Sequence, residues 1–147
     1  MAKCSDVMTR EPVCCEPGDS VTQVAGVMKR EDIGSIPVVE SREDRQLVGI
    51  VTDRDLVVKV LAGGTSIDAA TVRDAMTSNP ASCREADDVS KAVELMSQRQ
   101  VRRMPIVDGS GRLTGIISQA DVATRVHSDQ KTGELVEAIS EPGLARK

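Results

Sequence analysis

The sequence contains no phenylalanine, tryptophan or tyrosine, and its single histidine is His127. Without aromatic side chains the protein has no surface on which nucleic-acid bases could stack. Its core must therefore be built from Val, Ile, Leu, Met and Ala. Because aliphatic side chains bury less area than aromatic ones, we expect a domain of this size to gain stability by burying further surface in a homodimer.

Long apolar runs and charge of one sign are also missing. No run approaches the roughly 18 residues that a membrane-spanning helix needs, and the first residues lack the apolar core of a signal peptide. The 147 residues carry a net charge of −4 with acids and bases interspersed, unlike the basic stripe of a nucleic-acid-binding protein. The sequence therefore predicts a cytoplasmic protein with no nucleic-acid and no membrane partner.

Metal-binding and catalytic patterns are scarce. The cysteines are Cys4, Cys14, Cys15 and Cys83, without a C-x-x-C spacing, which together with the single histidine argues against a structural zinc site. In a chain without a secretion signal, buried free thiols are expected rather than disulfides. No G-x-S-x-G, P-loop or G-x-G-x-x-G pattern occurs. We expect no catalytic residue, no metal site and no enzymatic activity.

An internal repeat is the strongest signal in the sequence. The stretch that begins at Asp6 aligns with the stretch that begins at Asp74 at an offset of 68 residues, and "LVGIVTDRDL" then aligns with "LTGIISQADV" at an offset of 66. The two extra residues of the first copy lie in the polar stretch "ESREDRQ", where a surface turn tolerates a change of length. Cys15 and Cys83 are equivalent positions, and the sequence leaves open whether they pair.

Each copy shows the pattern of a β-α-β-β-α unit. A short strand follows the proline, a helix follows an N-cap signal, two β-branched runs form a hairpin, and a second helix follows the hairpin. The first helices are predicted after Ser20 and Asp88, and the second helices from Asp53 and Gln119.

The predicted fold class is α+β, with mixed helices and strands. A unit of this kind leaves one sheet face uncovered, so we expect two repeats packed sheet to sheet with pseudo-twofold symmetry. The predicted ranges are 1–67 for the first repeat with its lead-in and second helix, 68–128 for the second repeat, and 129–147 for a helical tail. In that tail, the spacing of Leu135, Val136 and Ile139 predicts one apolar helix face.

A short hydroxyl–carboxylate motif occurs once in each copy, as Gly49-x-x-Thr52-x-x-Asp55 and Gly115-x-x-Ser118-x-x-Asp121. The hydroxyl stands where a strand leads into a helix, whose exposed backbone amides favour anions. The carboxylate, one helical turn later, could accept hydrogen bonds from the two hydroxyl groups of a ribose. The alternative is a capping box, in which the hydroxyl caps the helix and the acid returns a hydrogen bond to the backbone. Both interpretations stay open.

Arg102 and Arg103 precede a predicted strand of the second copy, whereas Gly34 and Ser35 hold the equivalent positions of the first copy. Two adjacent guanidinium groups suit the phosphate chain of a nucleotide. The alternative is a pair of solvated surface arginines. In either case the two copies should not bind the same ligand equally well.

With these motifs the chain resembles a tandem pair of CBS domains, also called a Bateman module, of the small stand-alone prokaryotic type. The resemblance covers about residues 3–126 and rests on two ordered sets, "MT-x-x-P", "IGSIPVV" and "GIVTDRDL", then "MT-x-x-P", "VRRMPIV" and "GIISQADV". It implies a non-catalytic sensor in signal transduction that binds an adenosyl nucleotide (AMP, ADP or ATP) in clefts between the repeats. It also implies a homodimer, an unidentified protein target and no required cofactor beyond that regulatory nucleotide.

The resemblance further implies the ligand contacts of two sites. In the first site, Asp55 would hold the ribose hydroxyls and Thr52 would contact ribose or phosphate. Arg102 and Arg103 would reach the phosphates, and the apolar walls would be Ile50, Ala81 and Val101. In the second site, the ribose and wall contacts would come from Ser118, Asp121, Ile116, Val13 and Ile33, with no basic pair. Two alternatives remain: S-adenosylmethionine as the ligand, or a ligand-independent dimeric scaffold or stress-response protein. A small nucleotide hydrolase is a third, which the lack of a base and of metal ligands argues against.

Overall fold

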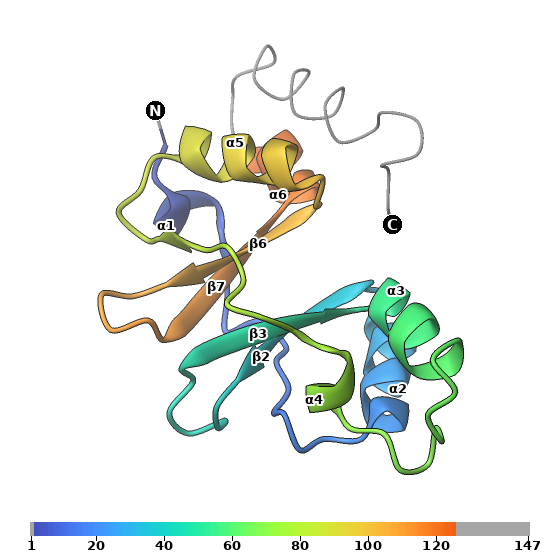
Figure 1. Ribbon diagram of the computed structural model, residues 1–147. Helices are drawn as coiled ribbons and strands as arrows, with labels where there is room; N and C mark the ends of the chain where they lie inside the picture. Colours follow the sequence, from blue (N-terminus) through green and yellow to red (C-terminus); the bar gives the residue numbers. More distant parts are fainter. Residues whose placement is uncertain (1, 126–147) are drawn as a thin grey trace. The chain divides into compact units, whose positions relative to one another are not determined.

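A computed structural model describes residues 2–125 of the chain. The predicted tail 129–147 and His127 lie outside the described residues. The chain divides into two compact units, which Figure 1 shows in colours that follow the sequence. The central unit is Val13–Pro80, and the flanking unit combines Met1–Pro12 with the chain from Ala81 onward.

The central unit contains a three-stranded sheet of order β2-β3-β4 and helices that pack on it. Its elements are α2 (Val21–Glu31), β2 (Ser35–Val39), β3 (Leu47–Thr52), α3 (Asp53–Asp55), the π-helix η1 (Leu56–Leu61), α4 (Val72–Ala75) and β4 (Thr77–Ser78). All neighbouring strands of this sheet run antiparallel. Cys15 adds an isolated parallel bridge to Val38, which is the remnant of the predicted first strand.

The flanking unit contains a four-stranded sheet of order β1-β7-β6-β5. Its elements are α1 (Cys4–Val7), β1 (Thr9–Arg10), β5 (Cys83–Arg84), α5 (Val89–Arg99), β6 (Arg103–Val107), β7 (Leu113–Ser118) and α6 (Gln119–Arg125). β5 pairs parallel with β6, and the other pairs are antiparallel. The parallel β5–β6 pair corresponds to the isolated Cys15–Val38 bridge of the central unit, and the β6–β7 hairpin corresponds to the β2–β3 hairpin.

The predicted mixed α+β fold is confirmed, and so are the first helices and the hairpins. Ser20 caps α2 by accepting a hydrogen bond from the backbone N–H of Gln23 at 3.1 Å. Asp88 caps α5 in the same way, accepting from the backbone N–H of Ser90 at 3.0 Å. The cores are aliphatic, as the lack of aromatic residues requires. Representative fully buried side chains are Ile36, Val38, Met96, Met104, Ile106 and Ile117.

Each short segment that leads into one repeat packs on the unit of the other repeat. The first lead-in forms α1 and β1, and its Thr9 pairs with Ile116 of β7. The second lead-in forms α4 and β4, and its Thr77 pairs with Ile50 of β3. The compact units are bounded differently from the predicted repeats 1–67 and 68–128, because residues 2–12 belong to the unit of the second repeat and residues 68–80 to that of the first. The repeat bounds themselves stay a prediction. A two-residue strand carries no periodicity that could reveal which sheet it joins.

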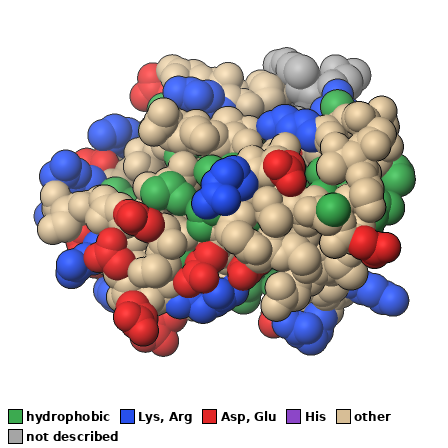
Figure 2. Space-filling view, turned by 60° about the horizontal axis from the view of Figure 1, so that its bottom comes forward, with side chains coloured by type: hydrophobic (Ala, Val, Ile, Leu, Met, Phe, Trp, Pro, Cys, Tyr) green, Lys and Arg blue, Asp and Glu red, His purple; other side chains and the backbone are tan. Residues whose placement is uncertain are grey.

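The surface is charged and mixed. Figure 2 shows Lys and Arg side chains interleaved with Asp and Glu on the face drawn, and hydrophobic side chains only in small groups. Among residues 2–125, no helix is both long enough and apolar enough to cross a bilayer. The most exposed apolar side chains belong to η1 and the loop after it: Val57, Val58, Leu61 and Ile67.

Candidate functional site

The two copies of the hydroxyl–carboxylate motif occupy the same place in their units, the junction where the hairpin's last strand leads into a helix. Thr52 is the last residue of β3, and α3 begins at Asp53. Ser118 is the last residue of β7, and α6 begins at Gln119. A β-branched strand followed by a hydroxyl residue and an acidic first turn is what ends the strand and starts the helix at this point.

Both motifs form capping boxes with nearly the same dimensions. Thr52 Oγ1 accepts from the backbone N–H of Asp55 at 3.1 Å, and Asp55 Oδ2 accepts from the backbone N–H of Thr52 at 2.9 Å. In the flanking unit, both reciprocal bonds between Ser118 and Asp121 measure 3.0 Å. The capping alternative is therefore realised in both copies.

Capping leaves one hydrogen-bond donor and one acceptor of each motif for a ligand. In each box the hydroxyl oxygen accepts the backbone hydrogen bond, so its own O–H can still donate to a ligand. The backbone bond uses Oδ2 of each carboxylate, and Oδ1 is the second oxygen that could accept from a ribose hydroxyl. A capping box and a ribose site are thus compatible at both junctions.

The carboxylate of the central unit has an additional charged neighbour. Lys59 Nζ lies 3.4 Å from Asp55 Oδ1, and it also donates a hydrogen bond to the carbonyl oxygen of Ala75 at 3.1 Å. The Asp55 side chain is 16% exposed and that of Lys59 is 41% exposed, so the pair is accessible from solvent. A ligand that uses Oδ1 of Asp55 must compete with, or bind beside, the Lys59 ammonium.

The strand register identifies the neighbours of each junction within its own unit. Ser35 lies opposite Thr52, and Arg103 lies opposite Ser118. Residues directly opposite in an antiparallel pair project to the same face of the sheet. Arg103 is therefore a neighbour of the Ser118 junction. Its predicted grouping with Thr52 joins residues of two different units and stays a prediction.

Arg102 brings an unused hydrogen-bond donor to the same region. Its backbone carbonyl accepts from the N–H of Gln119 at 2.9 Å, which anchors it at the start of α6. Its Nε and the Oε1 atom of Gln100 are the two buried side-chain polar atoms without a partner among the described residues. Because an unpaired buried donor costs about 1–3 kcal/mol, an anionic or carbonyl group that reached Arg102 Nε would bind favourably.

The predicted wall residues differ in how much surface they offer. Ile33 and Ile50 are half-buried in the central unit, and Val13 is exposed. In the flanking unit, Ala81 and Val101 are half-buried against the core, and Ile116 is 5% exposed. Ile116 therefore offers a ligand little surface, although the core residue of this part of β7 is its neighbour Ile117, on the opposite face of the strand. The assignment of walls across repeats stays a prediction.

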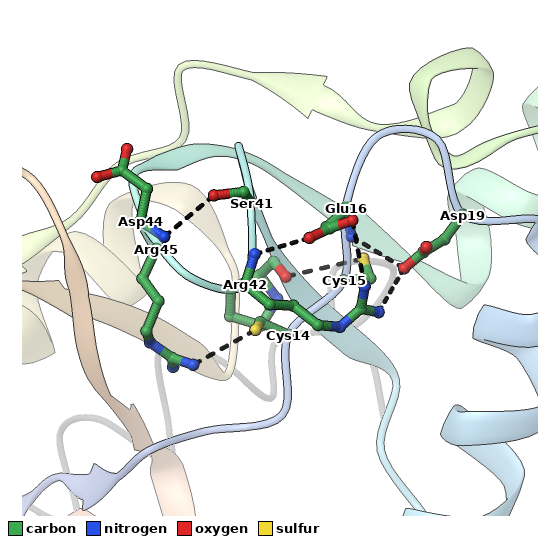
Figure 3. Close-up of polar contacts among 9 residues, drawn as sticks. Cys14, Cys15, Glu16, Asp19, Ser41, Arg42, Asp44 and Arg45 are labelled. Carbon is green, nitrogen blue, oxygen red and sulfur yellow. Dashed lines mark hydrogen bonds and ion pairs between the residues drawn. The ribbon is translucent and has the colours of Figure 1, made fainter.

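A charged cluster that the sequence analysis missed lies around Cys14 and Cys15 (Figure 3). Arg42 pairs with Glu16 at 3.2 Å and with Asp19 at 2.7 Å, and Arg45 donates a hydrogen bond to Cys14 Sγ at 3.7 Å. The hydrogen bond to Asp19 raises the pKa of Arg42, and burial raises the pKa of the Cys15 thiol to about 12.

Both arginines of this cluster come from the loop in which the first copy is two residues longer than the second. The two extra residues in this loop were the feature of the sequence that could have pointed to the cluster. The Arg42 contacts tie this loop to the turn before α2. The cluster thus links this loop to the segment before α2 within the central unit.

Across residues 2–125, no group of three or more His, Cys, Asp or Glu side chains is placed so that it could hold a metal ion. The ligand-binding potential of the described residues therefore rests on the two junctions and on the arginines beside Ser118.

Comparison with known proteins adds independent information. YlbB of Bacillus subtilis, an uncharacterized protein, is 36% identical over 141 residues, which cover 96% of this chain and 93% of the relative. Hypoxic response protein 1 of Mycobacterium tuberculosis is 30% identical over 142 residues, which cover 97% of this chain and 96% of the relative. Both relatives are thus similar to this chain over almost their whole length.

Solved structures show the same fold. A crystal structure of Hypoxic Response Protein I with two coordinated zinc ions matches with a TM-score of 0.76 at 30% identity, covering 85% of this chain and 99% of that one. The CBS domain pair of MJ0100, in complex with 5′-methylthioadenosine and S-adenosyl-L-methionine, matches with a TM-score of 0.71 at 25% identity, covering 84% and 94%. CBSX2 in complex with AMP shares the fold with a TM-score of 0.73 at 24% identity, covering 84% and 95%.

The family model for the CBS domain matches twice, at residues 4–62 and 72–128. These two matches coincide with the two copies of the internal repeat, and they include both hydroxyl–carboxylate motifs. They confirm the resemblance on which the expected fold was based. The chain belongs to the CBS-domain family and carries the domain as a tandem pair.

Proposed function

We propose that this protein is a non-catalytic regulatory protein whose CBS domains bind an adenosyl nucleotide, AMP, ADP or ATP, at the two strand–helix junctions. The observation that carries the proposal is the recurrence of the same hydroxyl–carboxylate geometry in both units. The bound ligands of the MJ0100 domain pair both contain an adenosyl group, which supports this ligand class.

Each side chain then has a distinct role. Oδ1 of Asp55 and of Asp121 accepts hydrogen bonds from the ribose hydroxyls, and the hydroxyls of Thr52 and Ser118 donate to ribose or phosphate oxygens. The half-buried aliphatic residues of the predicted walls contact adenine. Because aliphatic contact lacks the stacking energy of an aromatic ring, we expect micromolar affinity.

The arginines give the proposed sites a preference for phosphate. A guanidinium group can form two parallel hydrogen bonds with a phosphate, and Arg102 has a buried Nε without a partner among the described residues. We therefore expect ATP and ADP to bind more tightly than adenosine. S-adenosylmethionine, which is cationic and has no phosphate, should bind more weakly than ATP.

Regulation requires that the ligand bind two states of the protein with different affinity. We propose a homodimer as the framework for this change, read by a protein partner. Exposed apolar side chains support it: Val57, Val58 and Leu61 of η1 are 55%, 48% and 62% exposed. Three exposed aliphatic side chains on one short helix favour an interface with another chain. The cytoplasmic location remains a prediction.

Equilibrium dialysis tests the proposed binding in a way that this sequence makes simple. Because the chain has no Trp or Tyr, bound nucleotide can be read at 260 nm with little protein absorbance. With nuclease-treated protein and micromolar AMP, ADP or ATP, we expect excess nucleotide on the protein side of the membrane and no excess with GMP. Equal absorbance on both sides for all adenosyl ligands would contradict the proposal.

A ligand-independent dimeric scaffold is the second candidate, and the capping boxes favour it. If Asp55 and Asp121 only cap helices, their replacement lowers stability and nothing else. The scaffold predicts a dimer whose mass, measured by light scattering, is unchanged by nucleotide at any concentration, together with a negative dialysis result.

The ion pair at Asp55 predicts an effect on adenosine binding. Replacing Lys59 with methionine removes the ammonium that lies beside Asp55 Oδ1 while keeping the apolar stem. A solvent-exposed ion pair is worth up to about 1 kcal/mol, so adenosine should bind the Lys59→Met variant about two- to fivefold more tightly. Calorimetry with adenosine measures this change, and weaker binding would show that Lys59 instead holds the ligand.

A further inference from the structure

Two buried thiols that the proposed function does not use lie side by side in the flanking unit. Cys4 begins α1 and Cys83 begins β5. Their residues are 0% and 1% exposed, and both belong to the same core cluster. Each thiol lies close enough to the other to shift its pKa. In sequence the two residues are 79 positions apart.

Backbone hydrogen bonds fix this proximity. The N–H of Cys4 donates to the carbonyl oxygen of Asp87 at 2.8 Å, and the N–H of Ser5 donates to that of Glu85 at 3.0 Å. Cys4 Sγ also lies 3.9 Å from the carbonyl oxygen of Asp88. The N-terminal segment thus runs along the turn that directly follows Cys83.

The central unit repeats this arrangement with one substitution. Val72, the equivalent of Cys4, donates its N–H to the carbonyl oxygen of Asp19 at 2.8 Å, and Arg73 donates to that of Pro17 at 3.0 Å. Val72 and Cys15 share one core cluster, as Cys4 and Cys83 do. The same backbone frame therefore holds a valine against a cysteine in one unit and two cysteines in the other.

We propose that Cys4 and Cys83 form a reversible disulfide that ties the N-terminal lead-in to β5, so that the flanking unit contains a thiol–disulfide redox site. A disulfide needs two cysteines whose backbones are held close together, and the backbone hydrogen bonds of Cys4 and Ser5 hold the lead-in against the turn that follows Cys83. In a reducing compartment such a bond is expected to be transient and regulatory.

The oxidant is a low-molecular-weight disulfide, RSSR. The thiolate of Cys83 attacks one sulfur of RSSR and releases RS⁻, and the thiolate of Cys4 then attacks Cys83 Sγ of the mixed disulfide and releases a second RS⁻. The two protons lost by the cysteines pass to the two RS⁻ ions. The net change is oxidation of the two cysteine thiols to one disulfide and reduction of RSSR to two RSH molecules.

The surroundings indicate which thiol reacts first. The hydrogen bond from Cys4 lowers the pKa of Cys83, and Lys91 acts in the same direction against burial and Asp87. The same hydrogen bond, burial, and the charges of Asp87 and Asp88 raise the pKa of Cys4. Cys83 is therefore the attacking thiolate. Access requires local opening of the lead-in, whose regular elements are the four-residue α1 and the two-residue β1.

Thiol mapping on the full-length protein tests the proposal. The reduced protein is equilibrated with oxidised glutathione, quenched with acid, alkylated in denaturant and digested with trypsin. Trypsin places the cysteines in three peptides, 4–10, 11–29 and 74–84. We expect a disulfide that links peptide 4–10 to peptide 74–84, its reversal by dithiothreitol, and full alkylation of Cys14 and Cys15. Four alkylated cysteines at every ratio of oxidised to reduced glutathione would overturn the proposal.

Two variants sharpen the test. Cys4→Val introduces the residue that the other unit uses at this position, so the fold should persist while the linkage is lost. Val72→Cys should create a second linkage, between peptide 11–29 and peptide 60–73, because its backbone frame is the same. Oxidation should also raise the midpoint of thermal unfolding by about 5 °C or more in the wild type but not in Cys4→Val. Thiol loss in Cys4→Val equal to that of the wild type, or a wild-type linkage through Cys14, would refute the proposal.

Discussion

Replacing Asp55 with alanine should remove one of two adenosyl-binding events, and replacing Asp121 should remove the other. Each carboxylate accepts ribose hydrogen bonds in the proposed sites, and hydrogen bonds to a charged group contribute about 1.5–3 kcal/mol. We therefore expect AMP affinity at the altered site to fall about 10- to 100-fold. Isothermal titration calorimetry measures this effect: over a range of AMP concentrations that saturates the intact site, the stoichiometry should fall from about two AMP molecules per chain to about one.

The fold offers a matched control for the loss of a cap. Asp74 forms the same reciprocal box with Thr71 at the start of α4, with a 2.9 Å bond from the Thr71 N–H, but it lies outside both motifs. Asp74→Ala should lower stability by about 1 kcal/mol and leave nucleotide binding unchanged. If Asp55→Ala and Asp74→Ala have the same binding properties as the wild type, the carboxylates of the motifs serve only as caps.

The same variants determine which junction the arginines serve. Arg103→Ala should weaken ATP binding but leave adenosine binding almost unchanged, because it removes a phosphate contact. Combined with Asp121→Ala, it reports on the remaining Thr52 junction. Combined with Asp55→Ala, it reports on the Ser118 junction, which is its neighbour in the sheet register. The background in which the effect of Arg103→Ala persists identifies the site.

Gly115→Ala should destabilise the protein by about 2–3 kcal/mol, within the range for overpacked cores. A Cβ atom on Gly115 would clash with the Met8 side chain, with Cγ at 2.8 Å, and would lie 3.0 Å from the carbonyl oxygen of Thr9. Gly49 has the same environment in the central unit, where the carbonyl oxygen of Thr77 would lie 2.9 Å away. The glycine of each motif thus allows a lead-in strand to approach the sheet closely.

Gly26→Ala is the opposite control. Gly26 lies within α2, and a Cβ atom there would meet nothing within 4 Å. Because alanine favours a helix by about 1 kcal/mol over glycine, this substitution should stabilise the protein. Urea denaturation measures both variants. A Gly115→Ala variant as stable as the wild type would show that Met8 and β1 do not pack against β7 in this way.

The sequence predicted those parts of the fold that depend on local patterns. Apolar spacing predicted α2 and α5, the serine at position 20 predicted the first N-cap, and β-branched runs predicted both hairpins. Both hydroxyl–carboxylate motifs were found at the strand–helix junctions where the structure places them. Each of these signals lies within a short window of the sequence, and each recurs in both copies of the repeat.

Features that depend on contacts between distant residues were not predictable. The two lead-ins share the residues "MT-x-x-P", so the sequence could not show that each joins the unit of the other repeat. The proximity of Cys4 to Cys83 follows from that exchange, which is why comparison of Cys15 with Cys83 alone did not reveal it. The position of Arg103 opposite Ser118 needed the hairpin register, and the Arg42 cluster needed the path of the longer loop.

The most direct test of the account is a calorimetric titration of the nucleotide-free, full-length protein with AMP, ADP, ATP and S-adenosylmethionine, alongside the double variant Asp55→Ala/Asp121→Ala. The account predicts saturable binding with micromolar dissociation constants, ATP tighter than S-adenosylmethionine, and no binding to a double variant that remains folded. Absence of binding up to millimolar concentrations of every ligand, or equal binding to the double variant, would contradict it.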